Sequence, residues 1–168
     1  MPWGAFTLVL VVVYVLQTAA VRLLELPAVD LLLAFALFCG LAAGTHDARL
    51  AGWIVGFAQD LGSGGPLGPH AVALGLACWI LTALRAAVNL HLWWARLAGA
   101  FVAALAAQTL LLIHERWWQG LNDGSAFGAV LTLVAYSLIA ALVAAGLTQL
   151  PIFLAWDRRR RHYPRARW

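Results

Sequence analysis

The most informative segment of this chain is GWIVGFAQDLGSGGPLG, residues 52–68. It places one acid, Asp60, and a run of glycines within a sequence that is otherwise almost entirely apolar. Pro66 lies near its end and Pro69 follows it directly, and proline disfavours a helix because it lacks a backbone donor and clashes with the preceding turn. We therefore predict a helix that breaks into an irregular, glycine-rich segment at residues 62–69.

The composition indicates a membrane protein. Of the 168 residues, 64% are hydrophobic and 11% are charged, and the mean hydropathy is +0.85, so the chain lacks the polar surface of a soluble domain. Charged positions divide it into six candidate spans, at residues 3–21, 31–44, 50–61, 71–90, 97–113 and 126–156. We predict an all-α integral membrane protein with a six-helix membrane domain at residues 1–157 and a basic cytoplasmic tail at residues 158–168.

The second and third predicted spans are short. About twelve apolar residues rise only ~18 Å, whereas the hydrocarbon core of a bilayer is roughly 30 Å thick. The glycine-rich segment therefore has to complete the crossing partly at membrane depth. Irregular backbone is tolerated there only where protein or a water-filled cavity satisfies its polar groups, so we expect this segment to pack among helices.

The tail holds six of the eleven basic residues, all of them arginine: Arg158, Arg159, Arg160, Arg161, Arg165 and Arg167. Cytoplasmic segments of membrane proteins are enriched in such residues, which makes the first four predicted topology anchors. The basic excess is confined to a short piece beside the membrane. This favours contact with anionic lipid over binding to nucleic acid.

The other arginines predict the orientation of the chain. With a cytoplasmic tail and six spans, the N-terminus also lies in the cytoplasm, as do the connections that carry Arg49, Arg85 and Arg96. Only Arg22 and Arg116 then lie outside. The residues around Arg49, which include His46 and Asp47, are interpreted as a solvated turn between the second and third spans.

Two glycines and one acid share a face of the third span. Gly52 and Gly56 form a small-xxx-small pair, which lets another helix approach closely. Asp60 follows four residues later on the same face, and an ionised carboxylate facing lipid is very costly. Three roles are open for Asp60: a capping acceptor for amides of the glycine-rich segment, a group in proton or ion coupling, or a contact with a partner.

No pattern in the sequence indicates catalysis or a cofactor. Cys39 and Cys78 lie in apolar spans outside any Cys-x-x-Cys or Cys/His cluster, so we expect them to be small core residues. The histidines lack the spacing of metal ligands. No serine or cysteine has a histidine at helical spacing, and no pair of membrane-embedded carboxylates offers an acid and a base.

Two blocks of this sequence resemble the rod shape-determining protein MreD family of bacteria. The first is Gly52-x-x-x-Gly56-x-x-x-Asp60-Leu61, then Gly64, Leu67 and Gly68, followed by a hydrophobic helix from Ala71. The second is Pro151-Ile-Phe-Leu-Ala-Trp before Arg158 and Arg159. The length and the number of spans also fit this family.

The resemblance implies a non-catalytic scaffold of the cell-elongation machinery in the inner membrane. Such a subunit binds MreC, and through the complex it is linked to MreB filaments, the RodA glycosyltransferase and a class B penicillin-binding protein. MreD-like proteins are also similar in fold to the substrate-binding S components of ECF-type vitamin transporters, which supplies an alternative function. That alternative ranks second, because a vitamin pocket needs convergent polar groups and few polar residues lie within the predicted spans.

Overall fold

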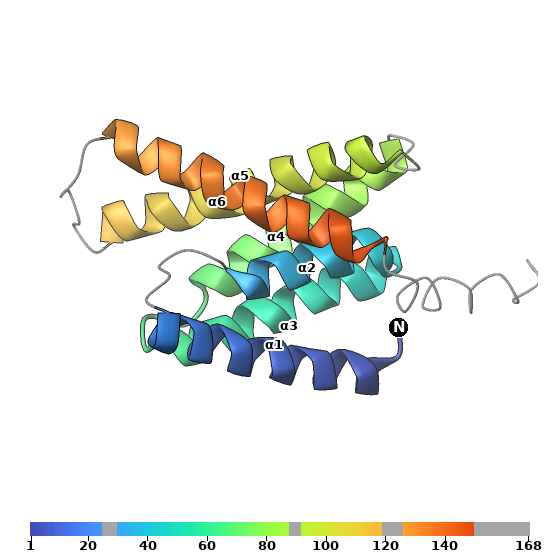
Figure 1. The fold of residues 1–168 in the computed structure, drawn as a ribbon, viewed down its shortest axis with the longest axis horizontal. Helices are drawn as coiled ribbons and strands as arrows, with labels where there is room; N and C mark the ends of the chain where they lie inside the picture. Colours follow the sequence, from blue (N-terminus) through green and yellow to red (C-terminus); the bar gives the residue numbers. More distant parts are fainter. Residues whose placement is uncertain (25–29, 88–91, 119–125, 150–168) are drawn as a thin grey trace, which may run out of the picture.

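Six helices, each running antiparallel to the one before it, make up the described part of the chain (Figure 1). The computed structural model describes residues 1–24, 30–87, 92–118 and 126–149. The helices are α1 (Trp3–Leu24), α2 (Leu31–Ala42), α3 (Thr45–Ser63), α4 (Pro69–Ala87), α5 (Trp93–Trp118) and α6 (Ala126–Leu147). The all-α prediction is confirmed for these ranges.

The short helix α2 is the centre of the bundle. It packs against each of the other five helices, and every residue from 32 to 40 is buried. A helix that is apolar on all sides is expected to be buried in this way. Phe35 of α2 stacks on Phe6 of α1 with ring centroids 5.6 Å apart, which joins α1 to the centre. Cys39 and Cys78 are both buried and free, as predicted.

Small residues fill the interior of the bundle, and large apolar residues cover its outside. In α5 and α6 the buried positions include Ala100, Ala103, Ala104, Ala107, Ala140, Ala141, Ala144 and Ala145. The exposed positions of the same helices include Val102, Ile113, Val130, Leu131, Leu138 and Leu142. Helices in lipid associate through close packing of small residues, because lipid tails are as apolar as leucine.

Within the described residues, three helical stretches are long and apolar enough to cross a membrane: Pro69–Ala87, Trp93–Trp117 and Val130–Leu147. Trp3–Ala19 and Leu31–Ala42 are apolar but shorter. Together with the apolar exterior, the three long stretches indicate a membrane protein.

The start of α3 corrects one prediction. The helix begins at Thr45 and not at residue 50, and only Ala43 and Gly44 connect it to α2, so His46, Asp47 and Arg49 form helix and not a solvated turn. The side chains of Asp47 and Arg49 find tertiary partners. The carboxylate of Asp47 binds the N-terminal amino group at 2.7 Å, and Arg49 binds a hydroxyl of α4.

Other boundaries differ from the predicted ones by a few residues. The helix α3 continues to Ser63 and α4 begins at Pro69, which shortens the irregular link to residues 64–68. The helix α5 extends beyond the predicted span at both ends. The helix α6 ends at Leu147, and residues 150–156 of the predicted sixth span lie outside the described residues.

Candidate functional site

The link between α3 and α4 is built on two glycines with positive φ. Gly64 ends α3 in the left-handed conformation at φ 66°, and Gly68 precedes α4 at φ 121°. Glycine adopts these angles without the steric cost that a Cβ imposes. Pro69 occupies the first position of α4, where its missing N–H leaves no helical hydrogen bond unmade. The proline that was predicted to break a helix therefore starts one.

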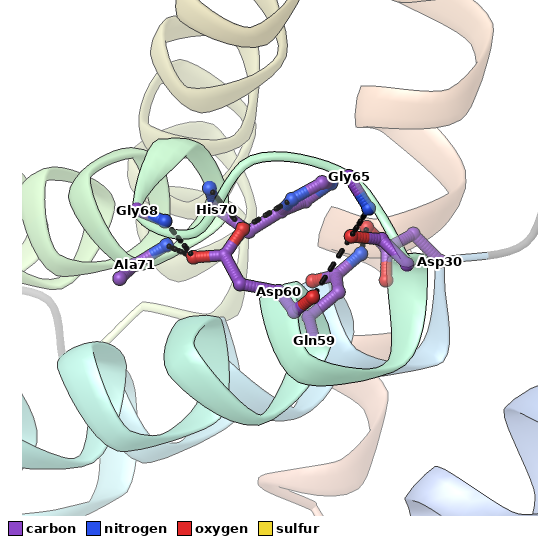
Figure 2. Close-up of polar contacts among 8 residues, drawn as sticks. Asp30, Gln59, Asp60, Gly65, Gly68, His70 and Ala71 are labelled. Atoms are coloured by element: carbon purple, nitrogen blue, oxygen red, sulfur yellow. Dashed lines mark hydrogen bonds and ion pairs between the residues drawn. The ribbon is translucent and has the colours of Figure 1, made fainter.

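Asp60 joins the end of α3 to the start of α4 (Figure 2). Its side chain is fully buried, and one carboxylate oxygen accepts from the backbone N–H groups of Gly68 at 2.9 Å and Ala71 at 3.0 Å. The other oxygen accepts from the backbone N–H of His70 at 3.0 Å and faces its ring Nδ1 at 2.8 Å. Because an ionised carboxylate only accepts, the ring donates through Nδ1–H.

This arrangement is a helix cap supplied by a neighbouring helix. The first N–H groups of any helix lack partners within it, and a negative charge near them also interacts favourably with the helix dipole. The four donors occupy the acceptor positions that the carboxylate of Asp60 offers. Of the three roles that the sequence left open for this acid, the geometry supports the capping role.

Gly52 and Gly56 bring the backbones of α3 and α4 into contact. A Cβ at Gly52 would lie 2.7 Å from Sγ of Cys78, and one at Gly56 would overlap the backbone of His70 and Ala71. Real Cβ atoms do not approach other atoms this closely, so neither position has room for a side chain. The small-residue face of α3 is therefore covered by α4, within the fold.

Sequence reasoning missed the reciprocal contact on α4. The indole ring of Trp53 lies against Gly75, where an added Cβ would be 2.7 Å from Cε2 of the ring. A glycine inside an otherwise apolar helix is a signal for such an approach. Gly52, Gly56 and Asp60 of α3, with Gly68 and Gly75 on the α4 side, form what we call the α3–α4 joint.

A second capping acid lies beside the joint and was also missed. Asp30 precedes α2, and its side chain accepts from the backbone N–H of Leu33 at 3.0 Å. The other oxygen of Asp30 accepts from the side-chain amide of Gln59 at 3.0 Å, and Gln17 of α1 accepts from the N–H of Leu31 at 2.8 Å. An acid directly before an apolar run is a signal for a helix start. The two caps fix α2 and α4 at the same end of the bundle.

The remaining predicted site residues are not drawn into the joint. Leu67 lies in the link with 63% of its surface exposed, and no atom of the described residues lies within 4 Å of a Cβ at Gly64. Pro151 and the arginines Arg158, Arg159, Arg160 and Arg161 lie outside the described residues. Within the described ranges no three His, Cys, Asp or Glu side chains are grouped so that they could hold a metal ion.

Replacing Gly68 with alanine is expected to destabilise the protein by about 1–3 kcal/mol, because φ 121° is strained for any residue with a Cβ. Gly65→Ala is the matched control, since its Cβ would meet only Oγ of Ser63 at 3.6 Å. Unfolding of both variants in detergent, followed by tryptophan fluorescence, measures the difference. Equal midpoints for the two variants would contradict the role of Gly68.

The fold and the joint define an all-helical membrane protein whose α3 and α4 are held together by glycines and a buried acid. No protein-family model, curated protein or solved structure matches the chain significantly.

Proposed function

We propose that this protein is a non-catalytic scaffold of the MreD type, which binds MreC in the bacterial inner membrane and helps to couple MreB filaments to peptidoglycan synthesis. One observation carries the proposal. Four motif residues of the resemblance, Gly52, Gly56, Asp60 and Gly68, serve the α3–α4 joint. A motif with this structural role suits a protein whose task is to present a fixed surface to other proteins.

The use of the polar side chains favours a scaffold over a vitamin-binding S component. Asp60 and Asp30 each cap a helix, and the amide of Gln59 binds Asp30. A small-molecule pocket needs polar groups that converge on the ligand. In this bundle, these three side chains hold helices together.

The proposal includes six membrane crossings with both termini in the cytoplasm. Arg49 lies near the start of α3, Arg85 in the last turn of α4 and Arg96 in the first turn of α5. Because successive helices are antiparallel, these three arginines lie at the same end of the bundle as Met1, and Arg116 lies at the opposite end (Figure 1). This clustering supports a cytoplasmic location for the end that carries Met1. In this proposal, the protein is linked to RodA and to a class B penicillin-binding protein indirectly, through the other members of the complex.

Co-purification tests the proposed function. The tagged full chain, extracted in mild detergent from its own membranes, is expected to retain the MreC encoded in the same genome. Leu61 and Leu67 are the large motif side chains that the fold leaves exposed, both at 63%, and Leu67 lies in the link itself, so Leu67→Ser is expected to reduce MreC recovery several-fold. Leu92→Ser is the matched control, because Leu92 is also exposed but lies at the other end of the bundle.

Two outcomes would overturn the proposal. One is the absence of MreC from the purified sample when both proteins are present in the membrane. The other is recovery of an ATPase module together with a tightly bound vitamin, which would identify a transporter component instead.

A further inference from the structure

Arg49 is held in a fixed orientation on the outer surface of α3 and α4, at the end of the bundle opposite Asp60 and the link between the two helices. Its Nε donates to the hydroxyl of Thr82 at 3.1 Å, and its guanidinium carbon lies 5.9 Å from the ring centroid of Trp79. An arginine stacked on an aromatic ring keeps its planar donors pre-organised. Among the described residues, no side chain or carbonyl accepts from its two Nη groups.

The position along the helices places this guanidinium near the edge of the hydrocarbon core. The 19 residues of α4 rise about 28 Å, close to the roughly 30 Å thickness of the core. Thr82 lies five residues before the end of α4, which is about 7.5 Å along the helix axis. A cation at this depth requires a counter-charge or a route to the headgroups.

The described part of the protein supplies no such counter-charge to Arg49. Asp47 is the acidic residue at this end of the described chain, and it binds the N-terminal amino group at 2.7 Å. Arg85 is nearby in the fold, and its guanidinium donates to the carbonyls of Gly40 and Ala43 at the end of α2. This end of the bundle is therefore positively charged.

Exposed apolar side chains continue from Arg49 toward the middle of the membrane. Trp53 follows Arg49 by one turn of α3 and is 48% exposed, and Trp79, one turn from Thr82 on α4, is 52% exposed. Leu50 and Ile54 are exposed on the same helix. Arg49 therefore lies at one end of an apolar surface strip. This arrangement is complementary to a phospholipid, whose phosphate lies at one end of its acyl chains.

We propose that Arg49, Thr82 and Trp79 form a binding site for the phosphate of an anionic phospholipid, with its acyl chains lying on Trp53 and Trp79. The Nη groups of Arg49 donate to the phosphate, and Trp79 and Thr82 hold the guanidinium in place. This inference goes beyond the proposed function, because it requires only that the protein lies in a bilayer. The site uses none of the tail arginines.

Lipid titration of the purified full chain in detergent tests this site. Phosphatidylglycerol is expected to bind more tightly than phosphatidylcholine with the same acyl chains, as measured by native mass spectrometry and by the rise in unfolding temperature. Arg49→Gln is expected to weaken phosphatidylglycerol binding about tenfold, which corresponds to the loss of one charge-assisted contact. Arg116→Gln, at the opposite end, is the control and is expected to bind as the wild type does.

Two further variants separate the site from general charge attraction. Arg49→Lys keeps the charge but loses the planar group, so intermediate binding is expected. Trp79→Leu changes an exposed side chain and is expected to fold and to bind several-fold more weakly, which keeps the test decisive if Arg49→Gln fails to fold. Equal binding of the two lipids by the wild type, or equal effects of Arg49→Gln and Arg116→Gln, would overturn the proposal. Stabilisation by inorganic phosphate alone that equals stabilisation by phosphatidylglycerol would overturn the lipid as the occupant.

Discussion

Asp60→Ala is expected to lower the free energy of unfolding by about 3–5 kcal/mol, because it leaves four donors, one of them buried and three partly buried, without an acceptor. The carboxylate accepts three backbone N–H groups at the start of α4 and faces the ring nitrogen of His70. An unsatisfied buried donor costs about 1–3 kcal/mol, and a bilayer or micelle interior supplies little water to replace the lost acceptor. The loss of charge also removes a favourable interaction with the dipole of α4.

Unfolding by SDS in mixed micelles, followed by the fluorescence of the nine tryptophans, gives the comparison. Asp60→Asn retains one acceptor oxygen and is expected to lose less stability than Asp60→Ala. Glu115→Gln is the control, because Glu115 is an exposed acid at the same end of the bundle. If Asp60→Ala unfolds at the same SDS concentration as Glu115→Gln, the capping role of Asp60 is wrong.

The existence of all six helices could be predicted from the sequence, because long apolar segments separated by charged positions specify helices in a membrane protein. The glycine link after α3 was also predictable, since glycines, prolines and one acid stand out in apolar surroundings. The ends of the link were not, because the sequence alone does not show whether Pro69 breaks one helix or starts the next. In the structure it starts α4.

The polar residues were harder to place, because their partners are distant in the chain. Asp47 binds the amino group of Met1, which is 46 residues away, and Arg49 binds Thr82, which is 33 residues away. Because neither partner is close in the sequence, the polar residues around Arg49 looked like a solvated turn. Gln59 and Asp30, which are 29 residues apart, are a further example. Spacing within one segment gives the face of a helix but not the neighbour that covers it.

For the same reason, the face shared by Gly52 and Gly56 was predicted correctly as a site of close approach, but its neighbour was not identified. The structure places α4 there. The proposed contact with MreC must therefore use other surfaces. Among the large motif side chains, Leu61 at the end of α3 and Leu67 in the link are exposed.

Gly56→Ala is expected to destabilise the protein by about 2–3 kcal/mol, and Gly56→Leu by more, because the added atoms overlap backbone and not a flexible side chain. The Cβ of alanine would meet the carbonyl of His70 and Cα of Ala71, so α3 and α4 would have to separate and the bonds of Asp60 would lengthen. Helix association in lipid depends on this close packing.

Gly146→Ala is the matched control for Gly56→Ala, since no atom of the described residues lies within 4 Å of a Cβ at this position in α6. Its effect is expected to be neutral or slightly stabilising, by up to about 1 kcal/mol, because alanine restricts the unfolded chain. The same SDS titration compares the two alanine variants, and equal midpoints would contradict the packing role of Gly56.

Because α4 covers Gly56, MreC recovery with Gly56→Ala should fall only in proportion to the unfolded fraction. A loss of MreC from a fully folded Gly56→Ala protein would instead place the partner directly on this face of α3.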